Sequence, residues 1–160
     1  MPKINSKLTG TAGEHYVAYK LSTMGYVAAI PREGAPTVDI LACTVDAEKI
    51  VSIQVKTTDW ATRTRGRGKN KKPHHLEFPL GHKAAKYNSE NLVFTFVDLN
   101  GIDWEDKAPD VYVVPSKFVY DFCKDWVDSA KMVRFHIGID EISEFKNNWD
   151  PIIKRLESVS

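Results

Sequence analysis

The sequence predicts an α/β fold, in which helices and strands alternate along one domain of 160 residues. Three observations support this prediction: an amphipathic helical pattern near the N-terminus, two Val- and Ile-rich runs spaced as a hairpin, and the apolar run LVFTFV at 92–97. A nearly continuous apolar run is typical of a central strand covered on both faces. Hydrophobic residues make up 42% of the chain, which is enough for a core and argues against disorder.

Composition and charge narrow the class of protein. The net charge is +1, so affinity for nucleic acid would have to come from local clusters of basic residues. No apolar run approaches the roughly 18 residues of a membrane helix, and the N-terminal segment MPKINSKLTG lacks the apolar stretch of a secretory signal. The two cysteines, Cys43 and Cys123, are too few for a disulfide framework and are expected as buried thiols. We therefore expect a cytoplasmic protein.

The first helix is expected from Thr11 to Met24, with Gly25 ending it as glycine commonly does. Glu14 lies on the apolar stripe of this helix, so its carboxylate should point toward the sheet. A second interpretation is equally consistent with the pattern. Thr11 and Glu14 have the spacing of a capping box, in which Glu14 would only satisfy a backbone donor. The stripe consists of Val17, Ala18 and Leu21.

The hairpin is expected from two strands, 38–43 and 50–56. Pairing them about a central turn brings apolar residues opposite one another on one face: Val38 with Val55, Ile40 with Ile53, and Ala42 with Val51. The other face then carries Asp39 opposite Gln54, and Lys56 points the same way. Opposed residues have Cβ atoms roughly 4.5–5.5 Å apart. An acid, a carboxamide and an ammonium group therefore converge on one patch.

The segment from Asp59 to Leu76 is expected to be a long loop, and such loops are usually functional. No acidic residue interrupts it after Asp59, and its basic residues are Arg63, Arg65, Arg67, Lys69, Lys71 and Lys72. This density of like charge favours a contact with a polyanion, although a solvated loop would have the same composition. His74 and His75 are adjacent, so their side chains are expected on opposite faces of an extended segment.

The rest of the chain alternates between short strands and helices. Expected strands lie at 26–30, 77–80, 111–114 and 132–136, and expected helical segments at 83–87, from Ser116, at 139–145 and from Asp150.

Taken together, Glu14 on an early helix, Asp39 on a strand and Gln54-Val55-Lys56 on the next strand resemble the PD-(D/E)XK nuclease superfamily. This superfamily includes restriction enzymes, Holliday-junction resolvases and repair nucleases. Residues 10–14, GTAGE, also resemble the start of its first helix. The resemblance implies a restriction-endonuclease-like α-β-β-β-α-β core over about residues 8–127, with a mixed central sheet flanked by helices. A C-terminal helical extension would follow over about residues 128–160.

The resemblance also implies a chemistry. In such enzymes the residue matching Asp39 binds Mg²⁺, which Mn²⁺ can replace, and the residue matching Gln54 joins it through its side-chain oxygen. Glu14 would reach the metal through water, and Lys56 would hold the nucleophile and neutralise charge on phosphorus. The expected activity is Mg²⁺-dependent cleavage of DNA phosphodiester bonds by a restriction-like or repair endonuclease. This chain departs from the pattern at Val38, where the family has proline, and at Gln54, where it has Asp or Glu.

The departure at Gln54 motivates an alternative, a catalytically inactive nucleic-acid-binding module of the same fold. A further alternative is a metal-independent interaction protein in which Glu14 is a helix cap. Cleavage in the presence of metal separates the first interpretation from the other two, and binding of DNA separates those from each other. The expected partner is duplex or branched DNA, not a membrane, and a homodimer or higher homo-oligomer is left open.

Overall fold

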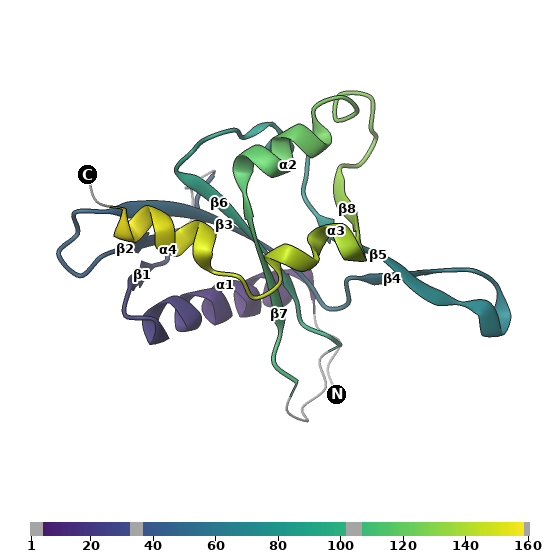
Figure 1. Cartoon of the computed structure of the whole chain (residues 1–160), viewed down its shortest axis with the longest axis horizontal. Coiled ribbons are helices and arrows are strands. Elements are labelled where there is room, and N and C mark those ends of the chain that lie inside the picture. Colours follow the sequence, from purple (N-terminus) through teal and green to yellow (C-terminus); the bar gives the residue numbers. More distant parts are fainter. Residues whose placement is uncertain (1–4, 33–36, 102–106, 159–160) are drawn as a thin grey trace.

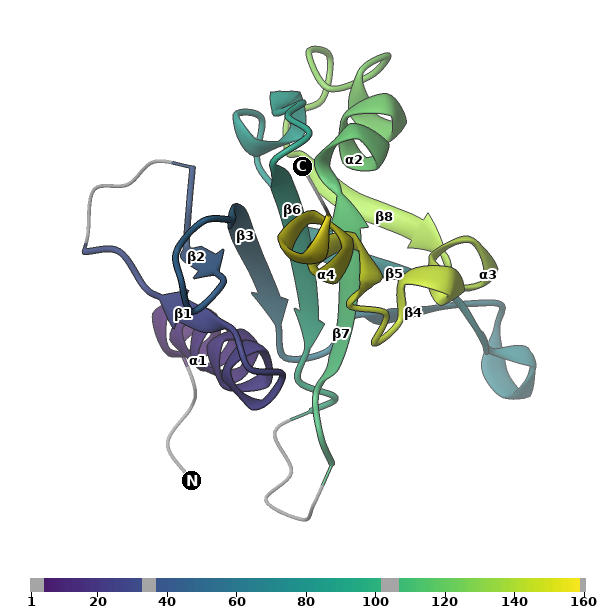
Figure 2. The ribbon, with the colours of Figure 1, turned by 60° about the vertical axis from the view of Figure 1, so that its left-hand side comes forward.

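The computed structural model describes residues 5–32, 37–101 and 107–158, whose arrangement is shown in Figure 1. Its central sheet has five strands in the order β1-β2-β3-β6-β7. Neighbouring strands are antiparallel except for β3 and β6, which are parallel, so the sheet is mixed as expected. Figure 2 shows β3, β6 and β7 side by side. The strands are β1 (Val27–Ala29), β2 (Ile40–Cys43), β3 (Ile50–Thr58), β6 (Leu92–Asp98) and β7 (Asp110–Pro115).

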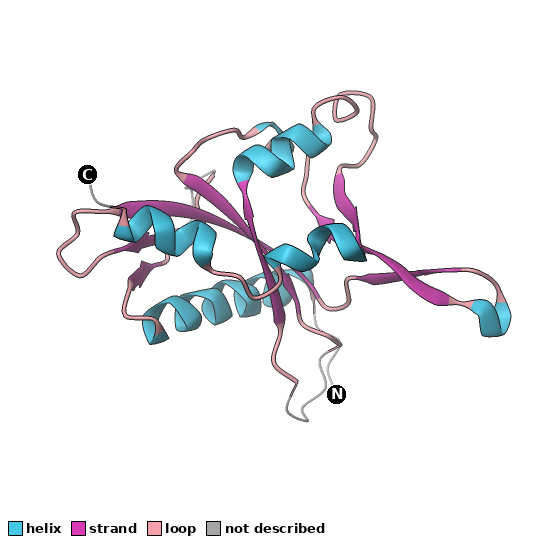
Figure 3. Ribbon diagram, in the orientation of Figure 1, coloured by secondary structure: helices cyan, strands magenta, loops and turns pink. Residues whose placement is uncertain are grey.

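A second sheet of three strands, in the order β4-β5-β8, lies against the first. It consists of β4 (Thr62–Arg65), β5 (Lys72–Pro79) and β8 (Arg134–Gly138). The segment after residue 127 therefore contributes a strand as well as helices, which Figure 3 distinguishes by colour. The helices are α1 (Ser6–Thr23), α2 (Ser116–Cys123), α3 (Ile139–Ile142) and α4 (Asp150–Glu157), with short 3₁₀ segments η1 (Gly68–Asn70), η2 (Ala84–Lys86) and η3 (Ser143–Phe145). Across the described residues, no helix is both long and apolar enough to cross a membrane.

One face of the central sheet packs against α1 and α4. Val17 and Leu21 of α1 and Ile152 and Leu156 of α4 belong to one buried cluster with the strands. The apolar residues of the hairpin lie on this face, and they are Ile40, Ala42, Val51, Ile53 and Val55. The apolar pattern of the hairpin therefore faces a core, as predicted.

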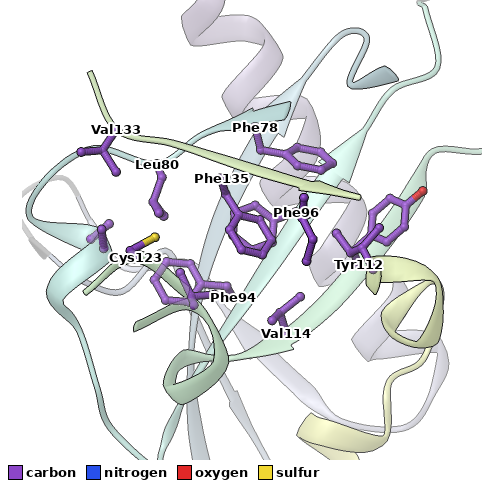
Figure 4. Close-up of a cluster of buried hydrophobic side chains, with 14 of the residues drawn as sticks. Phe78, Leu80, Phe94, Phe96, Tyr112, Val114, Cys123, Val133 and Phe135 are labelled. Carbon is purple, nitrogen blue, oxygen red and sulfur yellow. The ribbon is translucent and has the colours of Figure 1, made fainter. Parts of the chain in front are cut away.

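The opposite face packs against the second sheet and α2 through aromatic side chains. Figure 4 shows Phe94 and Phe96 of β6 among Phe78 of β5 and Phe135 of β8. The rings of Phe96 and Phe135 are stacked, with centroids 4.5 Å apart. Since β6 is buried on both faces along its whole length, the prediction of a central strand there is confirmed.

Helix α1 begins earlier than predicted, and this removes one interpretation of Glu14. Asn5 is the N-cap, and its side-chain oxygen accepts a hydrogen bond from the Leu8 amide at 3.0 Å. Thr11 lies inside the helix, where its hydroxyl donates to the carbonyl of Lys7. The capping box at Thr11 and Glu14 is therefore wrong, because the cap is six residues upstream of Thr11.

The basic segment is not a structureless loop. Residues 62–75 form a hairpin of β4 and the first half of β5, closed by η1, which we call the arm; it projects from the body in Figure 1. Its register shifts by one residue, since Arg63 pairs with His75 and Thr64 with Pro73. His74 is the extra residue of this bulge. The predicted opposite orientation of His74 and His75 is therefore wrong, and their Nδ1 atoms lie 3.1 Å apart.

Candidate functional site

The hairpin has the register that the sequence predicted. Ile40 pairs with Ile53, Leu41 with Ser52 and Ala42 with Val51. Asp39 stands immediately before β2, and its amide donates to the Ile53 carbonyl at 2.9 Å. Its carboxylate Oδ2 accepts a hydrogen bond from the Val55 amide at 2.7 Å. The carboxylate therefore lies against the backbone between Gln54 and Lys56.

Gln54 and Lys56 project from the face of β3 opposite to Val55, because side chains alternate along a strand. Gln54 is 7% exposed, and its Oε1 atom is buried with no hydrogen-bond partner among the described residues. A buried oxygen without a partner is costly in a stable fold and calls for a functional explanation. Gln54 thus supplies an uncommitted oxygen close to the Asp39 carboxylate.

Lys56 is half-buried, and this burial lowers the pKa of its ammonium group. The negative charge of Asp39 opposes the effect and raises the pKa. The lysine is therefore held near its carboxylate partner in a setting of reduced dielectric, where its charge acts more strongly than in water.

Glu14 approaches Asp39 from the other face of the sheet. Helix α1 comes unusually close to β3 at Gly13, where a Cβ atom would lie 1.9 Å from Thr57 Oγ1. Thr57 shares its face with Val55, so α1 packs on the face of β3 opposite to Gln54 and Lys56. Burial raises the pKa of Glu14, and the nearby charge of Asp39 raises it further, whereas His15 lowers it. The two carboxyl groups line one cleft of about 560 Å³.

The structure thus brings together the four predicted catalytic residues, with Asp39 at the centre and Glu14 on one side, Gln54 and Lys56 on the other. Across the described chain, no group of three or more His, Cys, Asp and Glu side chains is arranged to hold a metal ion. A divalent ion here would need the Gln54 carboxamide oxygen beside the Asp39 and Glu14 carboxylates. Carboxylate and carboxamide oxygens are the hard ligands that Mg²⁺ prefers, so these residues fit that ion.

The six basic residues of the arm do not form one patch. Arg63 is anchored at the base, where its guanidinium donates to the Trp60 carbonyl at 2.8 Å and lies 3.8 Å from Glu77. The Arg65 guanidinium lies 3.4 Å from His74 Nε2. The other four project into solvent and have no ion-pair partner among the described residues; these are Arg67, Lys69, Lys71 and Lys72.

Sequence reasoning missed two parts of this region. The first is the role of Gly13 in bringing α1 close to β3. Its only indication in the sequence is a glycine inside a helical pattern, next to Glu14. The contact between Glu77 of β5 and Arg134 of β8 had no signal, because the two residues are 57 positions apart and nothing in the sequence indicates that their strands pair.

The comparisons with known proteins support the fold. Neither the protein-family models nor the curated protein sequences contain a match to this chain. Among solved structures, the chain is similar to a bacterial homing endonuclease, I-Ssp6803I, with a TM-score of 0.56 and 14% sequence identity. The alignment covers 96% of this chain and 95% of that one. At this identity the likeness establishes a shared fold.

Proposed function

We propose that this protein is a Mg²⁺-dependent endonuclease that hydrolyses DNA phosphodiester bonds, of a restriction-like or DNA-repair type. The observation that carries the proposal is the position of the Asp39 carboxylate, fixed on the Val55 amide between the uncommitted Gln54 oxygen and the half-buried Lys56. The similarity in fold to a homing endonuclease adds support to this proposal.

Asp39 and Gln54 would hold the metal ion, with Glu14 close enough to Asp39 for their charges to interact. When bound, Mg²⁺ would neutralise charge on a phosphate and lower the pKa of a coordinated water molecule. The Val55 amide keeps the Asp39 side chain in one orientation, so less entropy is lost when the site is filled.

Lys56 would donate hydrogen bonds to a phosphate oxygen or to the attacking water. Burial removes part of the solvation of its ammonium group and lowers its pKa, and the charge of Asp39 opposes this effect. A phosphate group would then meet a charge that is already oriented. Such preorganised donors stabilise the charge that develops on phosphorus without reorganising during the reaction.

The arm would supply contacts with the DNA backbone. The arm leads directly into β5, which pairs with β8 in the second sheet. Contacts of this kind depend on charge and carry no base sequence information. They would position a duplex or branched substrate over the site.

The decisive experiment is to incubate the wild type and Lys56→Met with linear duplex, single-stranded and branched DNA, in Mg²⁺, Mn²⁺ or EDTA. We expect the wild type to cleave in either metal but not in EDTA, and Lys56→Met to bind DNA without cutting it. Lys124→Met makes the same substitution at an exposed lysine away from the site, so it is the control and should cleave normally. Wild-type protein that binds DNA and never cuts it would instead be the inactive binding module.

A further inference from the structure

A second pocket, of about 600 Å³, opens where β3 meets the second sheet. Its polar lining residues come from four separate segments, and they are Thr58, Arg63, Glu77, His82, Lys131 and Arg134. Three of the six are permanent cations and one is an anion, so the pocket carries an excess of positive charge.

The pocket lies next to the candidate site along the same face of β3. Gln54, Lys56 and Thr58 are at alternate positions of this strand, so their side chains project to the same side. A step of two residues along a strand is about 7 Å. A molecule that lies across Lys56 therefore reaches the pocket at Thr58 without crossing the sheet.

Glu77 shows that an anion fits between the cations of this pocket. Arg134 donates a hydrogen bond to its carboxylate, and the Arg63 guanidinium lies 3.8 Å from it. His75 Nε2 is 4.0 Å away on the same side. Burial raises the pKa of Glu77, but the hydrogen bond and charge of Arg134, with the charges of Arg63 and His75, outweigh that effect and lower it. The carboxylate is therefore ionised and orients two guanidinium groups from different strands.

The two arginines keep donors beyond those that Glu77 accepts. A guanidinium has five N–H groups in a planar fork, which matches the oxygens of a phosphate. Arg134 uses one nitrogen for Glu77 and points its Nε toward Met132 Sδ, a weak acceptor, at 3.0 Å. Its third nitrogen has no partner within the described part of the chain. Lys131 at the rim is exposed and likewise has no ion-pair partner there.

We propose that this pocket binds a DNA phosphodiester group adjacent to the one that is cleaved. Arg134 and Lys131 contact the phosphate oxygens, and the Glu77 carboxylate is a positioning group that holds Arg134 and Arg63 in place. The proposal rests on the proposed function, because it takes DNA as the ligand. DNA is favoured over an acidic peptide because the pocket continues the face of Gln54 and Lys56 and adjoins the base of the arm.

The test measures whether the effect of neutralising one DNA phosphate on binding affinity depends on the Arg134–Glu77 pair. A set of short duplexes is made, each with a single methylphosphonate linkage, which removes the charge of one phosphate. The proteins are the full chain and the double variant Arg134→Gln/Glu77→Gln, which removes the ion pair without leaving Glu77 to repel the DNA. The matched control is Lys154→Gln/Asp150→Asn, which removes an ion pair of 3.2 Å on α4. Binding is measured in Ca²⁺ or EDTA, so that no cleavage occurs.

We expect one linkage beside the cleavage site to weaken wild-type binding about tenfold when it is neutralised, as for loss of a charged hydrogen bond. The same linkage should have no further effect on the Arg134/Glu77 double variant and its full effect on the Lys154/Asp150 control. Equal methylphosphonate effects in all three proteins would overturn the proposal.

The outcome separates this inference from the proposed function. Wild-type protein that cleaves DNA but shows no coupling at any linkage refutes the pocket alone. Coupling in a protein that never cleaves supports the pocket and refutes the nuclease. An oligoglutamate peptide that binds the wild type but not the double variant, without any coupling to DNA, would assign the pocket to a protein partner and refute it as a phosphate site.

Discussion

The carboxylate of Asp39 accepts a hydrogen bond from the backbone amide of Val55, 16 positions further along the chain, at 2.7 Å. In a β-sheet a backbone carbonyl of the neighbouring strand normally accepts the hydrogen bond of such an amide, but here the Asp39 side chain accepts it. The other carboxylate oxygen, Oδ1, accepts no hydrogen bond from the described residues, and the charge of Asp39 acts on both Glu14 and Lys56. Asp39 therefore has two functions that mutation can separate, one in stabilising the hairpin and one in the proposed chemistry.

Replacing Asp39 tests both functions. Asp39→Asn keeps an oxygen for the Val55 amide, so it should fold as the wild type does but should not cleave DNA. Asp39→Ala leaves the buried amide unpaired, so it should lose about 1–3 kcal/mol of unfolding free energy as well. DNA binding should persist in both, because each removes a negative charge near a phosphate. Urea denaturation and cleavage assays measure the two effects, and normal cleavage by either variant would contradict the metal mechanism.

The close approach of α1 to β3 makes a second prediction. Gly13→Ala would place a Cβ atom 1.9 Å from Thr57 Oγ1, so the helix must move outward and carry Glu14 with it. Overpacking of this kind costs about 1–3 kcal/mol. Gly10→Ala is the matched control in the same helix, since nothing lies within 4 Å of its Cβ position. It should be neutral or slightly stabilising, because alanine favours helix.

Thermal denaturation of these two variants and of Gly13→Ala/Thr57→Ala measures the contact. The double variant removes the threonine hydroxyl and methyl groups that the added Cβ atom of Gly13→Ala would meet, so it should recover part of the loss. Equal stability of Gly13→Ala and Gly10→Ala would show that α1 does not need this approach.

The hairpin could be predicted from sequence because its pattern allows one register. The apolar pairs at Ile40 and Ala42 place one face on a core, and a slip of one residue would bury Asp39 and Gln54 there. The candidate site follows from that register with little further information. Glu14 was predicted to lie near it, but the face could not be known, because the side on which a helix packs depends on contacts such as Gly13 with Thr57.

Strands at 77–80 and 132–136 were predicted, but their pairing with each other and with residues 62–65 in a second sheet could not be, for a different reason. The basic stretch has too few apolar residues to indicate strands, and β5 is stabilised by packing of Leu76 and Phe78 in the core cluster with residues of β6 and β8. The bulge at His74 depends on pairing with Arg63, which sequence spacing does not show. The ion pair of Glu77 with Arg134 requires β8 to return beside β5, a long-range choice made by the aromatic core.

The ionisation of Glu14 makes stability depend on pH. Its pKa in the folded state is raised above the ordinary value of 4.5, so the folded protein binds this proton more tightly than the unfolded chain. Ionisation of Glu14 therefore destabilises the fold, and the penalty is present above the folded pKa and vanishes as the pH falls below 4.5.

Glu14→Gln should consequently raise the melting temperature at pH 7, and the gain should shrink as the pH falls through 4.5. Cleavage should fall in the same variant, which would identify a residue kept for activity at some cost in stability. Glu90→Gln, an exposed glutamate outside the site, gives the background. A Glu14→Gln protein that is less stable than the wild type at pH 7 would contradict the conclusion that ionised Glu14 destabilises the fold.

The exposed cations of the arm should contribute to DNA binding through charge. Arg67→Ala/Lys69→Ala removes two charges at the tip, and Lys117→Ala/Lys124→Ala removes one charge from α2 and one from the residue that follows it, with the same change in net charge. Each lost phosphate contact should reduce the slope of log affinity against log salt by about 0.9. We expect the flatter slope and weaker binding in the tip variant on every duplex sequence. Equal effects of the two double variants would show that net charge alone is responsible.

The uncommitted oxygen of Gln54 makes the last prediction, because it separates ligand chemistry from packing. Gln54→Met removes a buried oxygen that has no partner, at similar volume, so it should fold at least as stably as the wild type and should lose metal binding. Gln54→Glu adds a negative charge beside Asp39, so it should bind Mg²⁺ and Mn²⁺ more tightly. It need not cleave faster, since charge present before the transition state also stabilises the ground state.

Calorimetric titration of each protein, with and without a duplex, measures these metal affinities directly. In the wild type the duplex should tighten metal binding, because a phosphate oxygen completes a site that has few anionic ligands. Equal metal affinity in the wild type, Gln54→Met and Gln54→Glu would exclude this side chain as a ligand.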